Sequence, residues 1–148
     1  MASDDPVREL AHDHADLNRR VLELETFLTE DRMLAPFLPA LKELREQMFL
    51  HFAREEEGLF PLVSEWIPEL SDQVLAMVSA HDAVCGALAR MIHVASTETD
   101  LAALQGLLSR FVASYGDHAR TEVELLQRLD GSLDAKQRAQ LAELVRSL

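Results

Sequence analysis

The chain of 148 residues contains a single cysteine, Cys85, and only five glycines and five prolines. One cysteine excludes an internal disulfide and any zinc site built from cysteines alone, so a metal here would need histidine and carboxylate ligands. The scarcity of glycine and proline argues against a sheet of many strands, whereas the abundant leucine, alanine, glutamate and arginine favour helices. The composition therefore predicts an all-α fold.

Basic residues are also scarce, because 14 Lys and Arg stand against 26 Asp and Glu and leave a formal net charge of -12. Such a chain would repel a phosphate backbone, so we expect no nucleic acid partner. We see no apolar run near the roughly 18 residues that would span a bilayer, and the acidic start MASDDPVREL is unlike a secretory leader. We therefore expect a cytoplasmic protein with no membrane partner.

The length suits one domain over residues 1–148 with one core. Apolar residues spaced three and four apart predict four long helices between about residues 6 and 130, and a short helix at about 134–148 that covers them through Leu141, Leu144, Val145 and Leu148. The five helices are predicted to begin at Asp5 with Pro6, at about Pro36, after Ser71, near Thr99 and at about Asp134. The second helix should have a kink near Pro61, and Gly131 follows the end of the fourth helix.

Six ionisable residues interrupt the apolar stripes at inward positions, and they form an internal repeat. A shift of 67 residues takes His14 to His81, His51 to His118 and Glu55 to Glu122. Two helical hairpins that carry the same three polar groups can pack about a pseudo-two-fold axis. The repeat therefore predicts that all six side chains point at one region of the core.

These six residues have the chemistry of a metal site. A histidine and a glutamate four positions apart lie on one helix face, and two buried carboxylates with no inward Lys or Arg would need a cation. Four imidazoles and two carboxylates suit iron, manganese or zinc, and do not suit calcium or magnesium. Six ligands exceed the need of one tetrahedral zinc, but they suit two ions bridged by both carboxylates and by an oxo or hydroxo group.

Other interpretations of the individual residues stay open at this point. The six polar residues could satisfy one another in a core without metal. Cys85 could be a ligand or a small packed thiol, and Tyr115 could donate to a ligand or merely fill the core. His12 could lie near His14 as an outer group, although its position off the stripe favours exposure. Glu56 is expected on a solvated face.

The order His14, HFARE (residues 51–55), His81 and HARTE (residues 118–122), with EEEGLFP after the first pair, resembles the hemerythrin-like HHE cation-binding family over residues 7 to 129. The resemblance implies an up-down-up-down four-helix bundle with two non-haem iron ions, in preference to manganese or zinc. Family members bind oxygen, react with nitric oxide or peroxide, sense redox state or help to repair iron centres.

The sequence departs from the oxygen carriers of that family, which place two histidines one turn apart on the third helix. Here Met77 precedes His81 by four residues and Cys85 follows it by four, so the seventh ligand is missing. Two equally open irons suit redox chemistry on a small molecule better than storage. Members linked to iron-centre repair carry an extra cysteine-bearing N-terminal segment, for which we expect no room here.

We therefore expect a di-iron protein, monomeric or homodimeric, that binds or reacts with O2, NO or peroxide in stress response or sensing. Because no base, nucleophile or substrate pocket beyond the metal can be identified, the sequence leaves enzymatic turnover open. The alternatives are a sensor or carrier module without turnover, an iron-centre repair protein, and a structural domain with one zinc or no metal.

Overall fold

The structure is a computed structural model that describes residues 5–29, 34–97 and 100–146, and these residues contain helices and turns but no strand. The prediction of an all-α fold is therefore confirmed. The helices are α1 (Pro6–Thr29), α2 (Leu34–Ala53), α3 (Phe60–Trp66), α4 (Ser71–Thr97), α5 (Leu101–Asp130) and α6 (Ala135–Arg146), with a π-helical turn η1 (Arg54–Leu59) and a 3-10 turn η2 (Pro68–Leu70).

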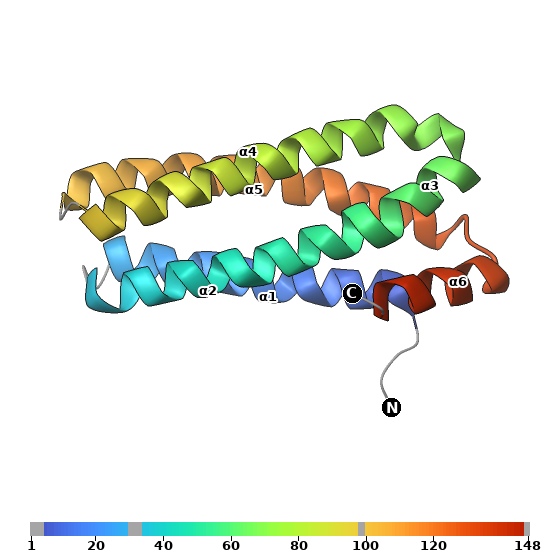
Figure 1. Cartoon of the computed structure of the whole chain (residues 1–148), viewed down its shortest axis with the longest axis horizontal. Helices are drawn as coiled ribbons and strands as arrows, with labels where there is room; N and C mark the ends of the chain where they lie inside the picture. Colours follow the sequence, from blue (N-terminus) through green and yellow to red (C-terminus); the bar gives the residue numbers. More distant parts are fainter. Residues whose placement is uncertain (1–4, 30–33, 98–99, 147–148) are drawn as a thin grey trace.

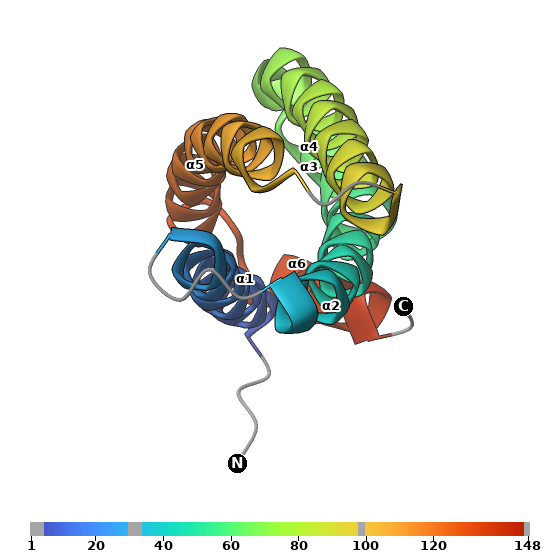
Figure 2. The same ribbon diagram turned by 90° about the vertical axis from the view of Figure 1, so that its left-hand side faces the viewer.

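Four long helical rods form the bundle, because α2, η1 and α3 follow one another as a single rod (Figure 1). The rods alternate in direction along the chain, up, down, up and down. Viewed end-on, α1 contacts α2 and α5, and α4 contacts the same two helices, so that the four rods surround a common axis (Figure 2). The short helix α6 packs on η1 and α1 at one end of the bundle.

Aspartates begin three of the helices. The Asp5 carboxylate accepts a hydrogen bond of 3.1 Å from the Val7 amide, as the predicted cap requires. Asp100 accepts one of 3.2 Å from Ala103, while the predicted start near Thr99 lies outside the described residues. Asp134 and Gln137 bond reciprocally at 2.8 and 3.0 Å, which fixes the start of α6. Gly131 caps the end of α5, as predicted.

The irregularity in the second rod differs from the predicted kink near Pro61. It begins earlier, at Arg54, as a turn in which the Phe60 amide donates to the carbonyl of Glu55, five residues back. Pro61 follows this turn and has no N–H to continue the hydrogen-bond ladder. Such widened turns recur at functional sites, and this one begins beside the inward residue Glu55.

The apolar core consists of two clusters at either end of the bundle, with the inward polar residues between them. One cluster is built around Leu24, Leu44, Leu88 and Phe111. The other is built around Leu10, Leu59, Leu125 and Leu141. Among the described residues, each cluster thus covers one end of the polar layer with apolar side chains.

Helix α6 covers the bundle through a narrower stripe than predicted. Leu141 and Val145 are buried against the second cluster, whereas Leu144 is 36% exposed. The expectation that Leu144 packs inward is therefore wrong, and Leu148 lies outside the described residues.

One stretch of the chain, Pro68–Thr97, is long and apolar enough by length and composition to cross a membrane, with a mean hydropathy of 1.3. This differs from the expectation that no stretch would qualify. The reason is that the exposed face of α4 carries few charges, and small uncharged residues such as Ala76, Ser79 and Ala83 lie between them. In the bundle, this helix packs on α2 and α5 and buries His81 at its middle.

Candidate metal centre

Six ionisable side chains meet at the middle of the bundle, between the two apolar clusters. α1 and α4 each contribute one histidine, α2 and α5 each contribute another, and both glutamates lie one turn beyond the histidines of the second and fourth rods. Each of these residues is at most 5% exposed. They are His14, His51, Glu55, His81, His118 and Glu122, so the structure brings together all six inward polar residues that the sequence singled out.

Glu122 lies at the centre of the group. Its Oε1 atom is 2.6 Å from Nε2 of His14 and 3.0 Å from Nε2 of His51, and its Oε2 atom is 3.0 Å from Nε2 of His118. Glu55 Oε1 lies 3.0 Å from Nε2 of His51 and 3.4 Å from Nε2 of His81. The Nε2 atoms of all four imidazoles therefore point toward the two carboxylates.

The donor atoms form two overlapping sets of four, in each of which all atoms lie within 4.8 Å of one another. One set contains His14 and His51, the other contains His81 and His118, and both contain Glu55 and Glu122. A pair of bridged metal ions would have this pattern, with two histidines for each ion and two carboxylates shared between the ions.

Several of these buried atoms have no hydrogen-bond partner within the described part of the chain. They are both carboxylate oxygens of Glu55, Oε2 of Glu122, and Nε2 of His81 and His118. Leaving a buried polar atom unsatisfied costs about 1–3 kcal/mol, and more for a charged group. Because all of these atoms point into one region and all can donate an electron pair to a cation, the residues fit a metal centre.

The electrostatics of the two carboxylates also fit a metal centre. Burial raises the pKa of Glu55 well above its usual range, and the neighbouring charge of Glu122 raises it further. Burial acts in the same direction on Glu122, but its close contacts with Glu55 and the histidines outweigh burial and hold the Glu122 pKa well below its usual range. Any proton that the pair holds without a cation therefore lies on Glu55 and not on Glu122.

The family of the chain follows from a comparison with known protein families. The model of the hemerythrin HHE cation binding domain matches residues 5–129, a span that contains all six residues. This chain belongs to the hemerythrin HHE family. It is accordingly a metal-binding domain, and its buried histidine and glutamate clusters agree with that role. Comparisons with curated proteins and with solved structures gave no significant match.

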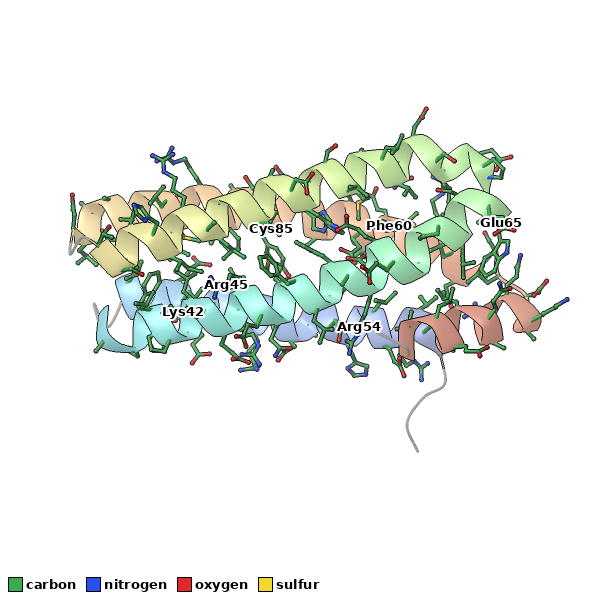
Figure 3. All side chains as sticks on the ribbon, viewed as in Figure 1. Lys42, Arg45, Arg54, Phe60, Glu65 and Cys85 are labelled. Atoms are coloured by element: carbon green, nitrogen blue, oxygen red, sulfur yellow. The ribbon has the colours of Figure 1, made fainter. Side chains whose placement is uncertain are left out.

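In this hemerythrin HHE domain, His51 has an outer carboxylate partner that the sequence analysis did not identify. Asp13 Oδ2 lies 3.2 Å from Nδ1 of His51 and accepts a hydrogen bond of 2.9 Å from Arg54. Nδ1–H donation to a carboxylate fixes the tautomer that leaves Nε2 free for a metal. Figure 3 shows Arg54 on the side of the second rod that faces α1, where Asp13 lies.

His81 has the corresponding partner in Glu56, whose Oε2 lies 3.1 Å from its Nδ1. The expectation that Glu56 belongs to a solvated face is only partly met, because its side chain is 35% exposed but its carboxylate bonds a buried imidazole. The π-helical turn explains this, because successive residues turn through a smaller angle there than in an α-helix. Glu55 and Glu56 can consequently both reach the site.

Two phenylalanines that the sequence analysis did not select enclose one side of the site. Phe52 stacks on His81 with ring centroids 3.7 Å apart and meets His118 edge-on at 5.5 Å. Phe60 covers His81 at 5.7 Å, and Figure 3 shows it on the side of the rod that faces α4. These rings hold the imidazole planes and exclude water from that side.

The three candidate outer residues, Tyr115, Cys85 and His12, have different surroundings in the structure. Tyr115 is buried, but its hydroxyl donates to Asn18 at 2.9 Å and not to one of the six residues. Cys85 is half-buried and outside both donor sets, and burial raises the pKa of its thiol to about 11. His12 is exposed and also outside both sets, so the placement near His14 that would make it an outer group is not seen.

Removing the outer carboxylate of His51 should weaken metal binding. In Asp13→Asn the charge that orients the imidazole is lost, and outer partners of this kind are worth about 10- to 100-fold in affinity. Iron affinity, measured by competition with a chelator, should fall by that factor. Asp16→Asn is the matched control, because the Asp16 carboxylate pairs with Arg19 and Arg20 on the same helix. Equal affinity for the two variants would contradict an orienting role.

Metal binding should release protons at neutral pH. Burial lowers the pKa of His51, but its close contacts with Asp13, Glu122 and Glu55 outweigh burial and raise that pKa to about 12, and burial also raises the pKa of Glu55. His51 is therefore protonated in the metal-free protein at pH 7, and the raised pKa of Glu55 favours its protonated form, so an incoming cation displaces at least one proton and binds more tightly as pH rises. Calorimetry in buffers of different ionisation enthalpy measures this number.

Glu55→Gln serves as the control for that titration, because the amide cannot ionise, so any proton displaced from Glu55 should disappear while the proton of His51 is still released. Binding without proton release in the unaltered protein would contradict the assignment of these two groups to the metal site.

Proposed function

We propose that this chain is a non-haem di-iron protein whose iron pair, held by His14, His51, Glu55, His81, His118 and Glu122, binds or reacts with O2, NO or peroxide in stress response or sensing. The observation that carries the proposal is the pair of overlapping donor sets that share both buried carboxylates. Membership of the hemerythrin HHE family supports a metal centre, for which iron is the typical ion.

The donor set favours iron among the common metals. Calcium and magnesium prefer oxygen ligands throughout, whereas each set here has two imidazole nitrogens. A structural zinc uses four ligands and would leave part of this cluster without a metal, whereas a pair of ions uses all six residues. Imidazole with bridging carboxylate is a combination that suits iron, although affinity alone would not exclude manganese or zinc.

The residues of the chain hold the centre in place rather than react themselves. Glu55 and Glu122 would bridge the two positions, and one histidine of each set is oriented by an outer carboxylate, His51 by Asp13 and His81 by Glu56. An iron pair so held would supply redox chemistry and an open coordination position for a small ligand. No further nucleophile or general base is required.

The place of Cys85 supports reactivity over simple oxygen storage. The oxygen carriers of the family have two histidines one turn apart on this helix, whereas this chain has Met77 one turn before His81 and the half-buried thiol of Cys85 one turn after it, outside both donor sets. Each position is thus left with two histidines and the shared carboxylates. Two comparably open ions suit the binding or reduction of a small molecule.

Metal analysis and rapid mixing test the proposal together. Protein purified without chelators should contain about two irons per chain, as the two donor sets require. Mixing the reduced protein with O2, NO and peroxide then separates turnover from stable reversible adducts, and adducts alone would favour the alternative of a sensor or carrier. A well-folded protein with one zinc or no metal would refute the di-iron assignment and leave a structural role.

A further inference from the structure

The internal repeat of the chain makes two seams of the bundle directly comparable. The shift of 67 residues relates α1 to α4 and α2 to α5, so the seam between α1 and α2 corresponds to the seam between α4 and α5. Figure 2 shows these two seams on opposite sides of the bundle. Each seam passes over one histidine of the centre, His51 in the first and His118 in the second.

The same positions line a hollow in both seams, but the hollows differ greatly in size. In the α1–α2 seam the space is about 20 Å³, whereas in the α4–α5 seam it is about 330 Å³. Smaller side chains explain the difference. Asp13, Asp16, Gln47 and Arg54 in the first seam correspond to Ala80, Ala83, Ser114 and Thr121 in the second.

The α4–α5 cavity reaches the candidate metal centre. His118 forms part of its wall, although this residue is only 4% exposed. Nδ1 of His118 has no hydrogen-bond partner within the described residues, whereas the corresponding Nδ1 of His51 is bonded to Asp13. The position of Asp13 is taken here by Ala80, so a methyl group and open space replace the carboxylate.

We propose that the α4–α5 cavity is an access and docking site for a small uncharged gas, such as NO or O2, on its way to the metal position of His81 and His118. This inference rests on the proposed function and narrows its ligand. Ala80 and Ala83 leave the space beside His118 open, while the corresponding space beside His51 is filled by the Asp13–Arg54 ion pair.

The walls of the cavity favour a neutral ligand over an ion. Met77, Ala80 and Val84 give it a mainly apolar surface. Asp117 is the charged residue among those that line it, and its exposed carboxylate is paired with Arg120. A chain with a formal charge of -12 also repels anions at long range. A dissolved gas needs no hydrogen-bond partner and loses nothing on entering such a space.

The test combines a probe that is independent of iron with a kinetic measurement. Crystals under xenon pressure report whether the cavity holds an apolar atom, with or without metal. Stopped-flow mixing of the reduced, iron-loaded protein with NO, and separately with azide, reports access to the centre. Two filling variants, Ala83→Leu on α4 and Ser114→Leu on α5, approach the cavity from different helices, so that a folding defect in one does not decide the result. Ala89→Leu, at an exposed position of α4 outside the cavity, is the matched control.

We expect xenon in the cavity of the unaltered protein and of Ala89→Leu, and none in the two filling variants. NO association should slow about tenfold or more in both filling variants at unchanged iron content, and azide association should slow less. Absence of xenon from the unaltered cavity, an unchanged NO rate, or a larger effect on azide than on NO would each overturn the inference. If the protein holds no iron, the proposed function fails, and xenon occupancy alone decides whether the cavity accepts a neutral gas.

Discussion

Replacing Glu122 with alanine should remove both metal ions, whereas replacing His118 with alanine should leave about one per chain, because Glu122, like Glu55, contributes to both donor sets and His118 contributes to one. Glu122 is fully buried, and its two oxygens contact His14, His51 and His118. Its removal also leaves the protonated His51 without one of its carboxylates. Losing one partner of a buried ion pair costs about 3 to 5 kcal/mol.

Iron analysis and thermal unfolding measure these two effects. For a domain of this size, that loss corresponds to a fall of about 10 °C in the midpoint of unfolding. Glu124→Ala is the control, because Glu124 lies on the same helix but is exposed, and it should keep both irons. Two irons in the Glu122 variant would contradict the bridging role, and complete loss in both site variants would show that the two positions do not fill separately.

The six central residues could be predicted from the sequence because two independent regularities agree there. Helical periodicity places His14 between Leu10 and Leu17 on a buried stripe, and the repeat places His81 in the same position of the second hairpin. Polar groups that recur on buried stripes at one fixed offset must meet if the hairpins pack on each other. The structure shows them in one layer of the core.

The outer partners could not be predicted in the same way, because periodicity describes one helix at a time. Asp13 and Glu56 lie beside ligand candidates in the sequence but off the buried stripe, and each bonds an imidazole on a different helix. Their role depends on the rotation of neighbouring helices. For Glu56 it depends also on the π-helical turn at Arg54–Leu59, which no apolar pattern signals. The prediction of a kink at Pro61 identified the disturbance but misplaced it.

The repeat contains a further signal that becomes interpretable only with the packing known. The offset that pairs the ligand candidates also pairs Asp13 with Ala80 and Arg54 with Thr121. In the sequence these are unremarkable changes at half-exposed positions. In the structure they separate a filled seam from an open one, and they distinguish His51, which is held by a carboxylate, from His118, which faces a cavity. The positions at which the two repeats carry different residues therefore show where the two halves of the site differ.

Removing the metal from the purified protein should lower its stability strongly. A ligand that binds only the folded chain stabilises it by about 4 kcal/mol at a free concentration a thousand times its dissociation constant. Without the ions, both oxygens of Glu55 and the Nε2 atoms of His81 and His118 have no hydrogen-bond partner within the described residues. At the usual relation of about 2 to 4 °C for each kcal/mol, chelation should lower the midpoint of unfolding by about 10 °C.

The metal dependence of that shift separates a built centre from general charge screening. Ferrous iron added back without oxygen should restore the midpoint, whereas calcium and magnesium at the same concentration should not, because half of each donor set is imidazole nitrogen. A Glu55→Gln, Glu122→Gln double variant keeps the shape of the core but loses both bridging carboxylates, so its midpoint should not respond to iron. If the chelated protein unfolds at the same temperature as the untreated protein, the polar layer is satisfied without a cation, and the six residues serve the fold alone.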